Sequence, residues 1–332
     1  MAYLGRRFHE RMDPRLLFPR ARSVVSFAHA YPPAPSILRD WQGELRGRIA
    51  AYAWGRDYHR VVGKRLSHLA GQISRLAPGA EARYYIDTGP ILEREWGYRA
   101  GLGWFGRNTM LLDQRAGSWF FLGEIFTNLD LPGGPPAADR CGACRRCRDA
   151  CPTGALDIDY QIDPRRCISY LTIEHRSAIP QEIRPKLGNW VFGCDTCQEV
   201  CPWNRTPGDP AAFEFLNPQL PAVLDLEPSA FRARYQGTAL TRTKRVGLLR
   251  NAAVVAGNSA NREAVPALGR ALSDPEPLVR RHAAWALGRL GGPLASTLLE
   301  RARHSAASTD PAVREEIERA LEEARDGASN RS

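Results

Sequence analysis

Hydrophobic residues in the first 132 positions follow two different periods, which predicts strands mixed with helices. Apolar residues at three- and four-residue steps predict a helix over residues 38–76, interrupted by a turn at 54–59, and a second helix over residues 92–100. Short runs rich in β-branched and aromatic residues predict strands at residues 23–31, 82–86, 110–112 and 119–125. Mixing of this kind favours an α/β or α+β domain.

A helical pattern repeats in the last third of the chain. The segment Arg250-Asn-Ala-Ala-Val-Val-Ala-Gly257 aligns with Arg281-His-Ala-Ala-Trp-Ala-Leu-Gly288. An Asp-Pro pair precedes a predicted helix at Asp274 and again at Asp310. Paired helices with small residues on the packing face are typical of HEAT-type α-solenoids, although a plain helical bundle is an alternative.

All eight cysteines fall within residues 141–201. They form a C-x2-C-x2-C-x3-C-P run, then a lone cysteine, then a C-x2-C-x3-C-P run. In such runs the closely spaced cysteines hold one [4Fe–4S] cluster, and the cysteine before proline ligates the other. One cluster is therefore predicted to take Cys141, Cys144, Cys147 and Cys201, and the other Cys151, Cys167, Cys194 and Cys197.

Three other interpretations of these motifs are less consistent with the sequence. Zinc sites also use C-x2-C pairs, but they rarely place three cysteines at this spacing before Cys-Pro. A disulfide framework needs an oxidising compartment, whereas residues 1–14 are charged and have no apolar run behind them. The glycine pattern over residues 101–106 follows a predicted helix rather than a strand, so close approach to a flat ligand explains it better than a dinucleotide site.

The sequence also has no run long enough to span a bilayer, and a cytoplasmic location is expected.

The chain is basic, with 46 Lys and Arg against 36 Asp and Glu and a formal net charge of +10. Such a charge favours an acidic or nucleic-acid partner, although solubility alone explains it equally well. The excess of Arg and Lys lies in the first two helical units of the repeats, over residues 242–289. Arg250 and Arg281 occupy equivalent repeat positions, so they are expected to project from one side and follow phosphates, unless that side is simply solvated.

Several motifs together resemble epoxyqueuosine reductase. Besides the cysteine motifs and the repeats, they are Asp87-Thr-Gly-Pro90, Ala100-Gly-Leu-Gly-Trp-Phe-Gly-Arg-Asn108, Gly117-Ser-Trp-x-Phe-Leu-Gly-Glu124, Arg166-Cys-Ile-Ser169 and Gly193-Cys-Asp-Thr-Cys197-Gln. The resemblance covers nearly the whole chain and implies an α+β fold of four parts. These are an N-terminal α/β cobalamin-binding domain (1–132), a ferredoxin-like domain with two [4Fe–4S] clusters (133–206), a connecting segment (207–240), and HEAT-like repeats that bind tRNA (241–326).

The resemblance also implies an enzyme and a reaction. Members of the family are oxidoreductases that reduce epoxyqueuosine to queuosine at the wobble position of tRNAs for Asp, Asn, His and Tyr, the last step of queuosine biosynthesis. The expected cofactors are cob(II)alamin and two [4Fe–4S] clusters. The expected partners are the tRNA anticodon stem-loop and an external electron donor of the ferredoxin or flavodoxin type. The protein is expected to be a monomer that does not bind membranes.

The same resemblance assigns roles by position. Asp87 matches the proton donor, a role that requires burial to raise its pKa well above the usual carboxyl range; without the resemblance, Asp87-Thr-Gly reads as a turn capped by the Asp side chain. Positions that match the lining of the corrinoid are Arg11, Asp87, Leu111, Leu122, Ser169 and Asp195. Arg94 and Asn108 are expected to support the same pocket. The candidates for contact with tRNA are His175, Arg250, Arg280 and Arg281.

The chain departs from the family pattern in two places. Members usually carry a further segment before the one that begins here at Ala2, which indicates either an internal start or loss of a strand and helix. Some members have a cysteine where this chain has Ala50, and we interpret that cysteine as dispensable.

Two other functions remain as alternatives. A corrinoid-dependent reductive dehalogenase is typically exported and lacks a basic solenoid, and a ferredoxin-like carrier would leave the N-terminal domain without a role.

Overall fold

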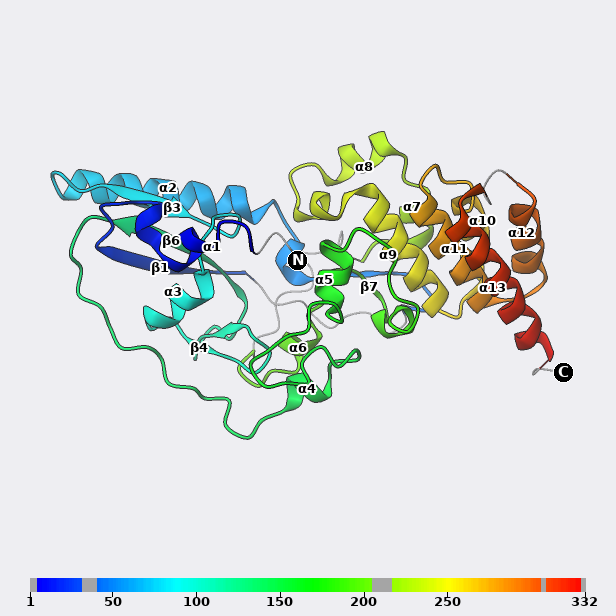
Figure 1. Cartoon of the computed structure of the whole chain (residues 1–332), viewed down its shortest axis with the longest axis horizontal. Coiled ribbons are helices and arrows are strands. Elements are labelled where there is room, and N and C mark those ends of the chain that lie inside the picture. Colours follow the sequence, from blue (N-terminus) through cyan, green and yellow to red (C-terminus); the bar gives the residue numbers. More distant parts are fainter. Residues whose placement is uncertain (1–4, 32–40, 205–216, 306–308, 330–332) are drawn as a thin grey trace.

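The computed structural model describes residues 5–31, 41–204, 217–305 and 309–329. The chain forms an elongated molecule with a sheet-containing part at one end and stacked helices at the other (Figure 1). Between them lies the cysteine-bearing part, which consists mainly of loops and short helices. The predicted α+β class is confirmed.

The N-terminal part is built on a three-stranded sheet of order β1–β6–β3. Strands β1 (Ser23–Ala30) and β3 (Ala82–Tyr85) both pair antiparallel with the central strand β6 (Phe120–Thr127). Helix α2 (Tyr58–Leu76) packs on one face of this sheet, and α3 (Glu93–Arg99) contacts β6 and β1. Short elements complete this part of the chain: α1 (Phe8–Met12), η2 (Pro14–Leu16), β4 (Trp104–Phe105) and β5 (Leu111–Leu112).

The glycine-rich loop before β5 folds back on its own chain. A Cβ atom on Gly103 would lie 2.1 Å from the carbonyl oxygen of Leu112, and one on Gly106 would lie 2.6 Å from Asn108 Oδ1. These glycines are therefore required by the approach of β4 to β5, with which it pairs antiparallel. The expected contact with a flat ligand is not needed to explain them.

The helix predicted over residues 38–76 was wrong in its first half. Residues 38–40 lie outside the described residues, and residues 41–57 contain turns, a short strand β2 (Arg48–Ile49) and a 3₁₀ turn η3 (Ala51–Ala53). Leu45 and Ile49 are buried, as their spacing suggested, but they pack in the core that contains β7 (Trp190–Phe192). Pairing of β2 with the distant β7 has overridden the helical period of the local sequence.

The cysteine-bearing part consists of short elements that share a core with the repeats. Its elements are α4 (Arg146–Asp149), α5 (Ile168–Ile173), η4 (Arg184–Leu187), β7 and α6 (Thr196–Glu199). Val191 and Phe192 of β7 are fully buried in the same cluster as Leu248 and Val254 of the first repeat helix. An ion pair of 2.8 Å between Arg184 and Glu316, with both side chains 1% exposed, also joins this part to the last helix.

The repeats form a layered stack of helices, as predicted. The segment expected to be a plain connection contains α7 (Leu220–Leu224), α8 (Pro228–Tyr235) and η7 (Ala239–Thr243), and the repeats follow as α9 (Lys244–Asn258), η8 (Arg262–Ala264), α10 (Val265–Ala271), α11 (Pro277–Leu290), α12 (Pro293–Arg303) and α13 (Pro311–Ser329). Gly257 and Gly288 are equivalent in the repeat, and each lets its helix approach the backbone of the next, at Ala286 and Ala320. Within the described ranges, none of the helices is both apolar and long enough to cross a membrane.

Candidate functional site

Four cysteines surround one cavity in the cysteine-bearing part. Cys141, Cys144, Cys147 and Cys201 line this cavity, and we call them the outer cluster site. Burial and the nearby thiols of Cys201 and Cys141 raise the pKa of Cys147 to about 11, which also shows that these sulfur atoms are close together.

The other four cysteines form a second group, the inner cluster site. Burial, Asp195 and the Cys167 thiol raise the pKa of Cys194 to about 12. Burial, with a further contribution from Cys151, raises the pKa of Cys167. Burial and the thiols of Cys194 and Cys167 raise the pKa of Cys197. The structure thus brings Cys151, Cys167, Cys194 and Cys197 together, which is the crossed arrangement expected from their spacing.

Among the residues that the structure describes, no three His, Cys, Asp or Glu side chains are grouped closely enough to hold one ion. A structural zinc site would need four such ligands at bonding distance of a single centre. The spacing of the cysteines along the chain instead matches the ligands of two [4Fe–4S] clusters.

A pocket of about 420 Å³ lies where the three parts of the molecule meet. Its lining combines the start of α2, the turn after β3, the end of α5 and η7: Tyr52, Asp57, Tyr58, His59, Asp87, Thr88, Ile173, Glu174, Ala239, Thr241 and Arg242. Asp87 has a φ of 37°, a backbone conformation that Asp tolerates better than most residues. Its carboxylate oxygen Oδ2 accepts hydrogen bonds from Tyr58 Oη and His59 Nε2, each at 2.8 Å, rather than capping its own turn.

His59 connects two carboxylates at the edge of this pocket. Its Nδ1 lies 2.7 Å from Asp57 Oδ1, and its Nε2 contacts Asp87. The hydrogen bond with Asp87, opposed by burial and reinforced by Asp57, raises the pKa of His59. Burial opposes the shift of Asp87, but hydrogen bonds from His59 and Tyr58 lower its pKa overall. The condition set for Asp87 as a proton donor, a pKa well above the usual carboxyl range, is therefore not met, because the hydrogen bonds outweigh burial, and the proton of this pair lies on His59.

Tyr52 links this pocket to the inner cluster site. Its ring is 6.0 Å from the ring of Tyr58 and 6.1 Å from that of Phe192. Burial, Asp87 and Asp195 all raise the pKa of Tyr52, so its hydroxyl lies close to both carboxylates. Asp195 is 1% exposed, and its Oδ2 accepts a hydrogen bond from the backbone N–H of Ala51 at 2.7 Å. The predicted pocket residues Asp87 and Asp195 thus approach the same space from different parts of the fold.

Two other predicted pocket residues hold the loop before β5. Asn108 is 3% exposed, and its Nδ2 donates to the carbonyl oxygen of Cys197 at 3.4 Å. Arg94 donates to the carbonyl oxygen of Thr109. Ser169 lies on α5, where it is partly exposed. Asn108 and Arg94 therefore support the loop that borders the inner cluster site.

The remaining predicted corrinoid-lining residues lie on the side of the sheet that faces α3. Leu111 and Leu122 are both close to Gly97 of α3, and Arg11 donates to the carbonyl oxygen of Ile91 at 3.3 Å. On the same face, neighbouring strands carry Ser26 and Glu124 directly opposite each other. Several polar atoms here are buried without a partner among the described residues: Arg11 Nε, Ser26 Oγ and both carboxyl oxygens of Glu124. Burial, with Glu93 nearby, raises the pKa of Glu124 to about 9, so this carboxyl group is protonated at neutral pH.

The structure contradicts two of the predicted tRNA contacts. Arg250 is 0% exposed, and its guanidinium donates to the carbonyl oxygens of Leu171, His175 and Ser177. Arg280 is 9% exposed and donates to the carbonyl oxygens of Asp274 and Pro275. Both predictions were wrong because a repeat position that reaches solvent in one unit faces a neighbouring element in another.

The other two candidates for tRNA contact are partly accessible. Arg281 is 27% exposed and pairs with Glu316 at 3.0 Å. His175 is half-buried, and its Nε2 lies 3.0 Å from the carbonyl oxygen of Ala178. Their role stays a prediction.

Sequence reasoning missed the partners of Asp87. Tyr58, His59 and Tyr52 lie in or beside the interruption of the predicted helix at residues 54–59, where only a turn was expected. The available signal was the cluster Asp57-Tyr58-His59 at a helix start, where Asp57 caps α2 by accepting from His59 N–H.

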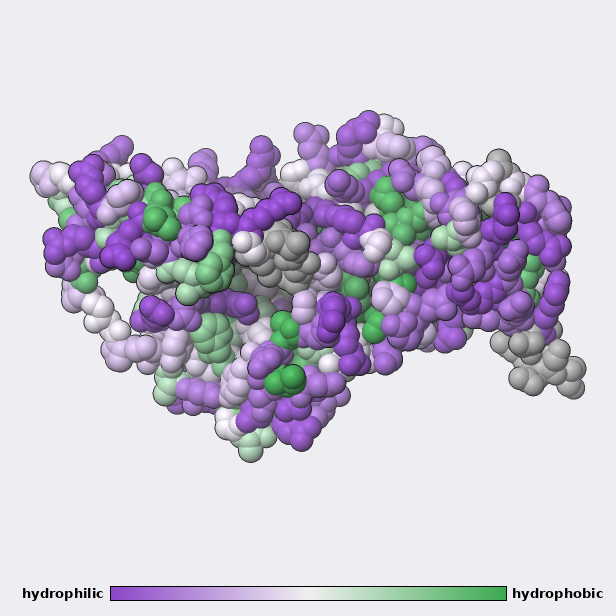
Figure 2. Space-filling model, in the orientation of Figure 1, coloured by the Kyte–Doolittle hydropathy of each residue, from purple (hydrophilic) through white to green (hydrophobic). Residues whose placement is uncertain are grey.

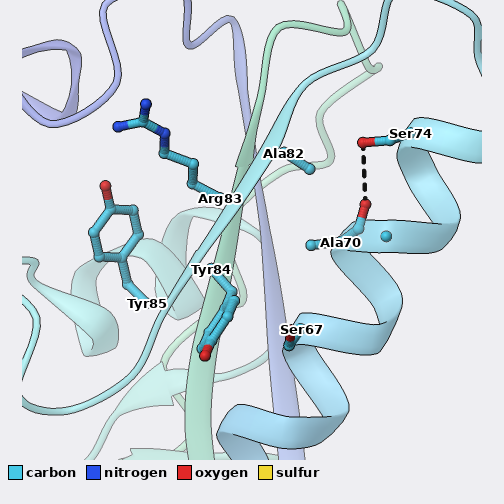
Figure 3. A pocket seen from close by; sticks show the side chains of 8 residues that line it. Ser67, Ala70, Ser74, Ala82, Arg83, Tyr84 and Tyr85 are labelled. Atoms are coloured by element: carbon cyan, nitrogen blue, oxygen red, sulfur yellow. Dashed lines mark hydrogen bonds between the residues drawn. The ribbon is translucent and has the colours of Figure 1, made fainter.

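A further hollow of about 510 Å³ is open and separate from these residues. It lies between α2 and the edge strand β3, and Ser67, Ala70 and Ala82 are among the residues that line it (Figure 3). The Ser74 hydroxyl donates back to the carbonyl oxygen of Ala70 at 3.4 Å. None of the predicted site residues lines this hollow, so it is not a candidate active site.

Comparisons with known proteins agree with this arrangement. The family model described as "Epoxyqueuosine reductase QueG, DUF1730" matches residues 11–88, "4Fe-4S double cluster binding domain" matches residues 140–204, and "HEAT repeats" matches residues 239–323. The epoxyqueuosine reductase of Synechocystis sp. is 43% identical over 251 residues, which cover 73% of this chain and 86% of the relative. The epoxyqueuosine reductase of Xanthomonas campestris pv. campestris is 39% identical over 303 residues, which cover 88% of this chain and 84% of the relative.

Solved structures give the same result. The crystal structure of an epoxyqueuosine reductase with a tRNA-Tyr epoxyqueuosine-modified stem loop has a TM-score of 0.88 at 33% identity, and the match covers 96% of this chain and 86% of that one. The structure from Streptococcus thermophilus has a TM-score of 0.85 at 30% identity, with coverage of 96% and 86%. The resemblance seen in the sequence is confirmed, as is the assignment to the oxidoreductases. The chain belongs to the epoxyqueuosine reductase family.

Proposed function

We propose that this protein reduces epoxyqueuosine to queuosine at the wobble position of tRNAs for Asp, Asn, His and Tyr, using cobalamin and two [4Fe–4S] clusters. The observation that carries the proposal is the position of the Asp87 pocket, which opens at the surface and is linked through Tyr52 to the inner cluster site. Electrons from the clusters and the modified nucleobase of the tRNA would meet at this pocket. Conversion of epoxyqueuosine tRNA by the reconstituted protein with dithionite as reductant tests the proposal, and absence of the queuosine product would contradict it.

The chain has buried groups that fit cobalamin. The corrin ring of cobalamin carries peripheral amides. Such amides would pair with buried polar atoms that lack partners, such as Ser26 Oγ and the protonated carboxyl group of Glu124. Leu111 and Leu122 would supply apolar contact, and Arg11 and Asp195 would supply polar groups from the N-terminal and the cysteine-bearing parts. Bound there, the cofactor would supply the low-potential chemistry that removes the epoxide oxygen.

Asp87 and His59 are proposed to deliver one of the two protons that the reaction consumes. Opening an epoxide leaves an alkoxide oxygen, and loss of that oxygen as water requires two protons together with two electrons. Because the pKa of Asp87 is lowered, its carboxylate is ionised at neutral pH and holds the His59 proton at Nε2. A proton moving from His59 through Asp87 Oδ2 would reach the pocket, and Asp57 would stabilise the imidazolium until then.

We expect replacement of His59 by Asn to lower kcat about 10- to 100-fold and to change its pH dependence. With a raised pKa, the wild-type imidazolium is fully protonated at low pH and loses its proton as the pH rises through that raised value. The rate of the wild type should therefore fall on the alkaline side, and the variant should lose this limb. Single-turnover rates from pH 5.5 to 9 measure both effects.

The matched control is His68→Asn, which removes an exposed histidine from the same helix. It should leave the rate and the alkaline limb unchanged. An alkaline limb that persists in His59→Asn would assign the titration to another group.

Basic side chains around the pocket are proposed to bind the anticodon stem. Arg56 and Arg60 flank the pocket residues Asp57 and His59, and Lys244 follows η7. All three are exposed, and their side chains have no ion pair within the described ranges. They are better placed than Arg250 to contact phosphates while a base enters the pocket.

We expect the double variant Arg56→Glu, Arg60→Glu to raise the KM for tRNA about tenfold or more with little change in kcat. The two lost phosphate contacts should also reduce the salt dependence of log KM by about 2. Steady-state kinetics at several salt concentrations, with dithionite as reductant, measure both. The control is Arg75→Glu, Arg289→Glu, which reverses two exposed arginines on α2 and on the repeats. A larger rise in KM in the control would instead place the RNA on the repeats.

A further inference from the structure

The outer cluster site lies beside the surface, whereas the inner cluster site adjoins the catalytic pocket. The chain around Cys141 and Cys144 is exposed at Arg140, Gly142 and Arg145. The inner site instead contacts buried groups, namely Asp195 and the Asn108 amide. Burial and the thiols of both sites raise the pKa of Cys197, and Cys147 of the outer site is among them, so the two sites are neighbours. Electrons from outside would therefore enter at the outer site and leave through the inner one.

An exposed hydrophobic loop is attached to the outer cluster site. Ile158 is 62% exposed and Tyr160 is 41% exposed. The Tyr160 hydroxyl donates to Asp139 Oδ2 at 2.5 Å, and Asp139 Oδ1 accepts from the backbone N–H of Cys141 at 2.8 Å. Arg107 lies 5.7 Å from the Tyr160 ring and donates to the carbonyl oxygen of Gly142 at 2.7 Å. The loop is thus fixed against the cluster-binding turn.

This loop has the apolar character of a contact surface. Ile158, together with Ile162, which is 40% exposed, borders a hollow of about 570 Å³. Strongly hydrophobic residues lie at the surface over the part of the molecule that carries α4 and α6 (Figure 2). Three large hydrophobic side chains exposed within five residues are unusual for a surface that only meets water.

Free positive charges flank the same site. Arg140 directly precedes Cys141, and Arg146 directly precedes Cys147 and lines the cavity of the outer cluster site. Both are exposed, and neither side chain has an ion-pair partner among the residues that the structure describes. Nearby Arg145 has only a loose pair, 3.7 Å from Asp149. Two arginines without ion pairs beside an apolar loop are complementary to a partner that presents acidic groups next to an apolar contact.

We propose that Arg140, Arg146, Ile158 and Tyr160 form the docking face for a small acidic electron-carrier protein, which reduces the outer cluster. The inference rests on the proposed function, since that reaction consumes two electrons. In each encounter one reduced carrier loses one electron and one oxidised cluster gains it, so two encounters supply one turnover. A transient interface of this kind is small, and opposite charges raise its association rate.

The test is anaerobic stopped-flow reduction of the cluster-loaded protein, without tRNA, by a photoreduced acidic flavodoxin. We expect Arg140→Glu, Arg146→Glu to lower the second-order rate constant about tenfold or more at low ionic strength, and the difference to shrink at 0.5 M salt. Ile158→Ser should lower it about fivefold at any salt concentration, because it removes apolar contact. Iron content and reduction by dithionite, which needs no docking, should stay as in the wild type.

The control is again Arg75→Glu, Arg289→Glu, which changes the net charge equally at distant exposed positions. An equal loss of rate in the control, or no loss in Arg140→Glu, Arg146→Glu, would overturn the docking face. Weaker tRNA binding in that variant at an unchanged reduction rate would overturn it in favour of an RNA surface. If dithionite supports conversion of epoxyqueuosine tRNA but the carrier reduces no cluster, the docking proposal fails and the function stands. If the carrier reduces the clusters but no queuosine forms with either reductant, the function fails.

Discussion

Replacing Asp87 by Ala should lower the turnover of epoxyqueuosine tRNA about 10²- to 10⁴-fold, the range typical of a lost proton-transfer group. The side chain is 49% exposed at the pocket and makes no contact with the cysteines, so its loss should leave both clusters and cobalamin in place. His59 would lose its partner at Nε2, and its pKa should fall toward the ordinary value. Single-turnover kinetics, iron analysis and visible spectra of the same preparation measure these properties.

A matched control for this variant is Asp130→Ala, which removes an exposed carboxylate paired only with Arg22 at the surface. It should behave as the wild type. Asp87→Asn adds a second test, because the amide keeps the size of the side chain but cannot carry the proton to the substrate. Full activity in either Asp87 variant would eliminate its role in proton transfer.

Replacing Arg250 by Met should lower the free energy of unfolding by about 3 kcal/mol or more, rather than affect tRNA binding. The guanidinium is completely buried and also donates to Asn251 Oδ1 at 2.8 Å, besides three backbone carbonyls. Met fills a similar volume but leaves those carbonyl oxygens buried without donors, and each such loss is costly. Urea unfolding followed by far-UV circular dichroism would measure the change, and KM for tRNA should remain as in the wild type.

The matched comparison is Arg281→Met, because Arg281 occupies the equivalent position in the next repeat. Arg281 is partly exposed, and its partner Glu316 keeps the buried pair with Arg184, so the expected loss is below about 1 kcal/mol. If the Arg250→Met protein were stable and its KM for tRNA were raised, Arg250 would have to contact the tRNA. That outcome would contradict its position between the repeats and the cysteine-bearing part.

The local sequence was sufficient wherever short-range chemistry decides the structure. Cysteine spacing predicted two sets of four ligands, because a tight loop offers only three thiols to one cluster. The aligned repeats predicted stacked helices, because Gly257 and Gly288 allow each helix to approach the next. The strand predicted at residues 23–31 appears as β1, since alternation along a strand is a local property.

Only the tertiary structure decided which side chains meet. Leu45 and Ile49 follow a helical period, yet their backbone forms a turn and the short strand β2, because pairing with β7 outweighs local propensity. Arg250 and Arg281 are equivalent in the repeat, but one faces the carbonyl groups around α5 and the other faces α13, so only one reaches solvent. His59 and Asp87 are far apart in the chain, and their contact lowers the pKa of the carboxylate and raises that of the imidazole. The sequence by itself predicted two sets of four cysteines for two clusters, and a fold of mixed helix and sheet followed by helical repeats. The charge state of the pocket and the accessible face of the repeats followed from long-range packing, which brings together groups whose interaction no local pattern encodes.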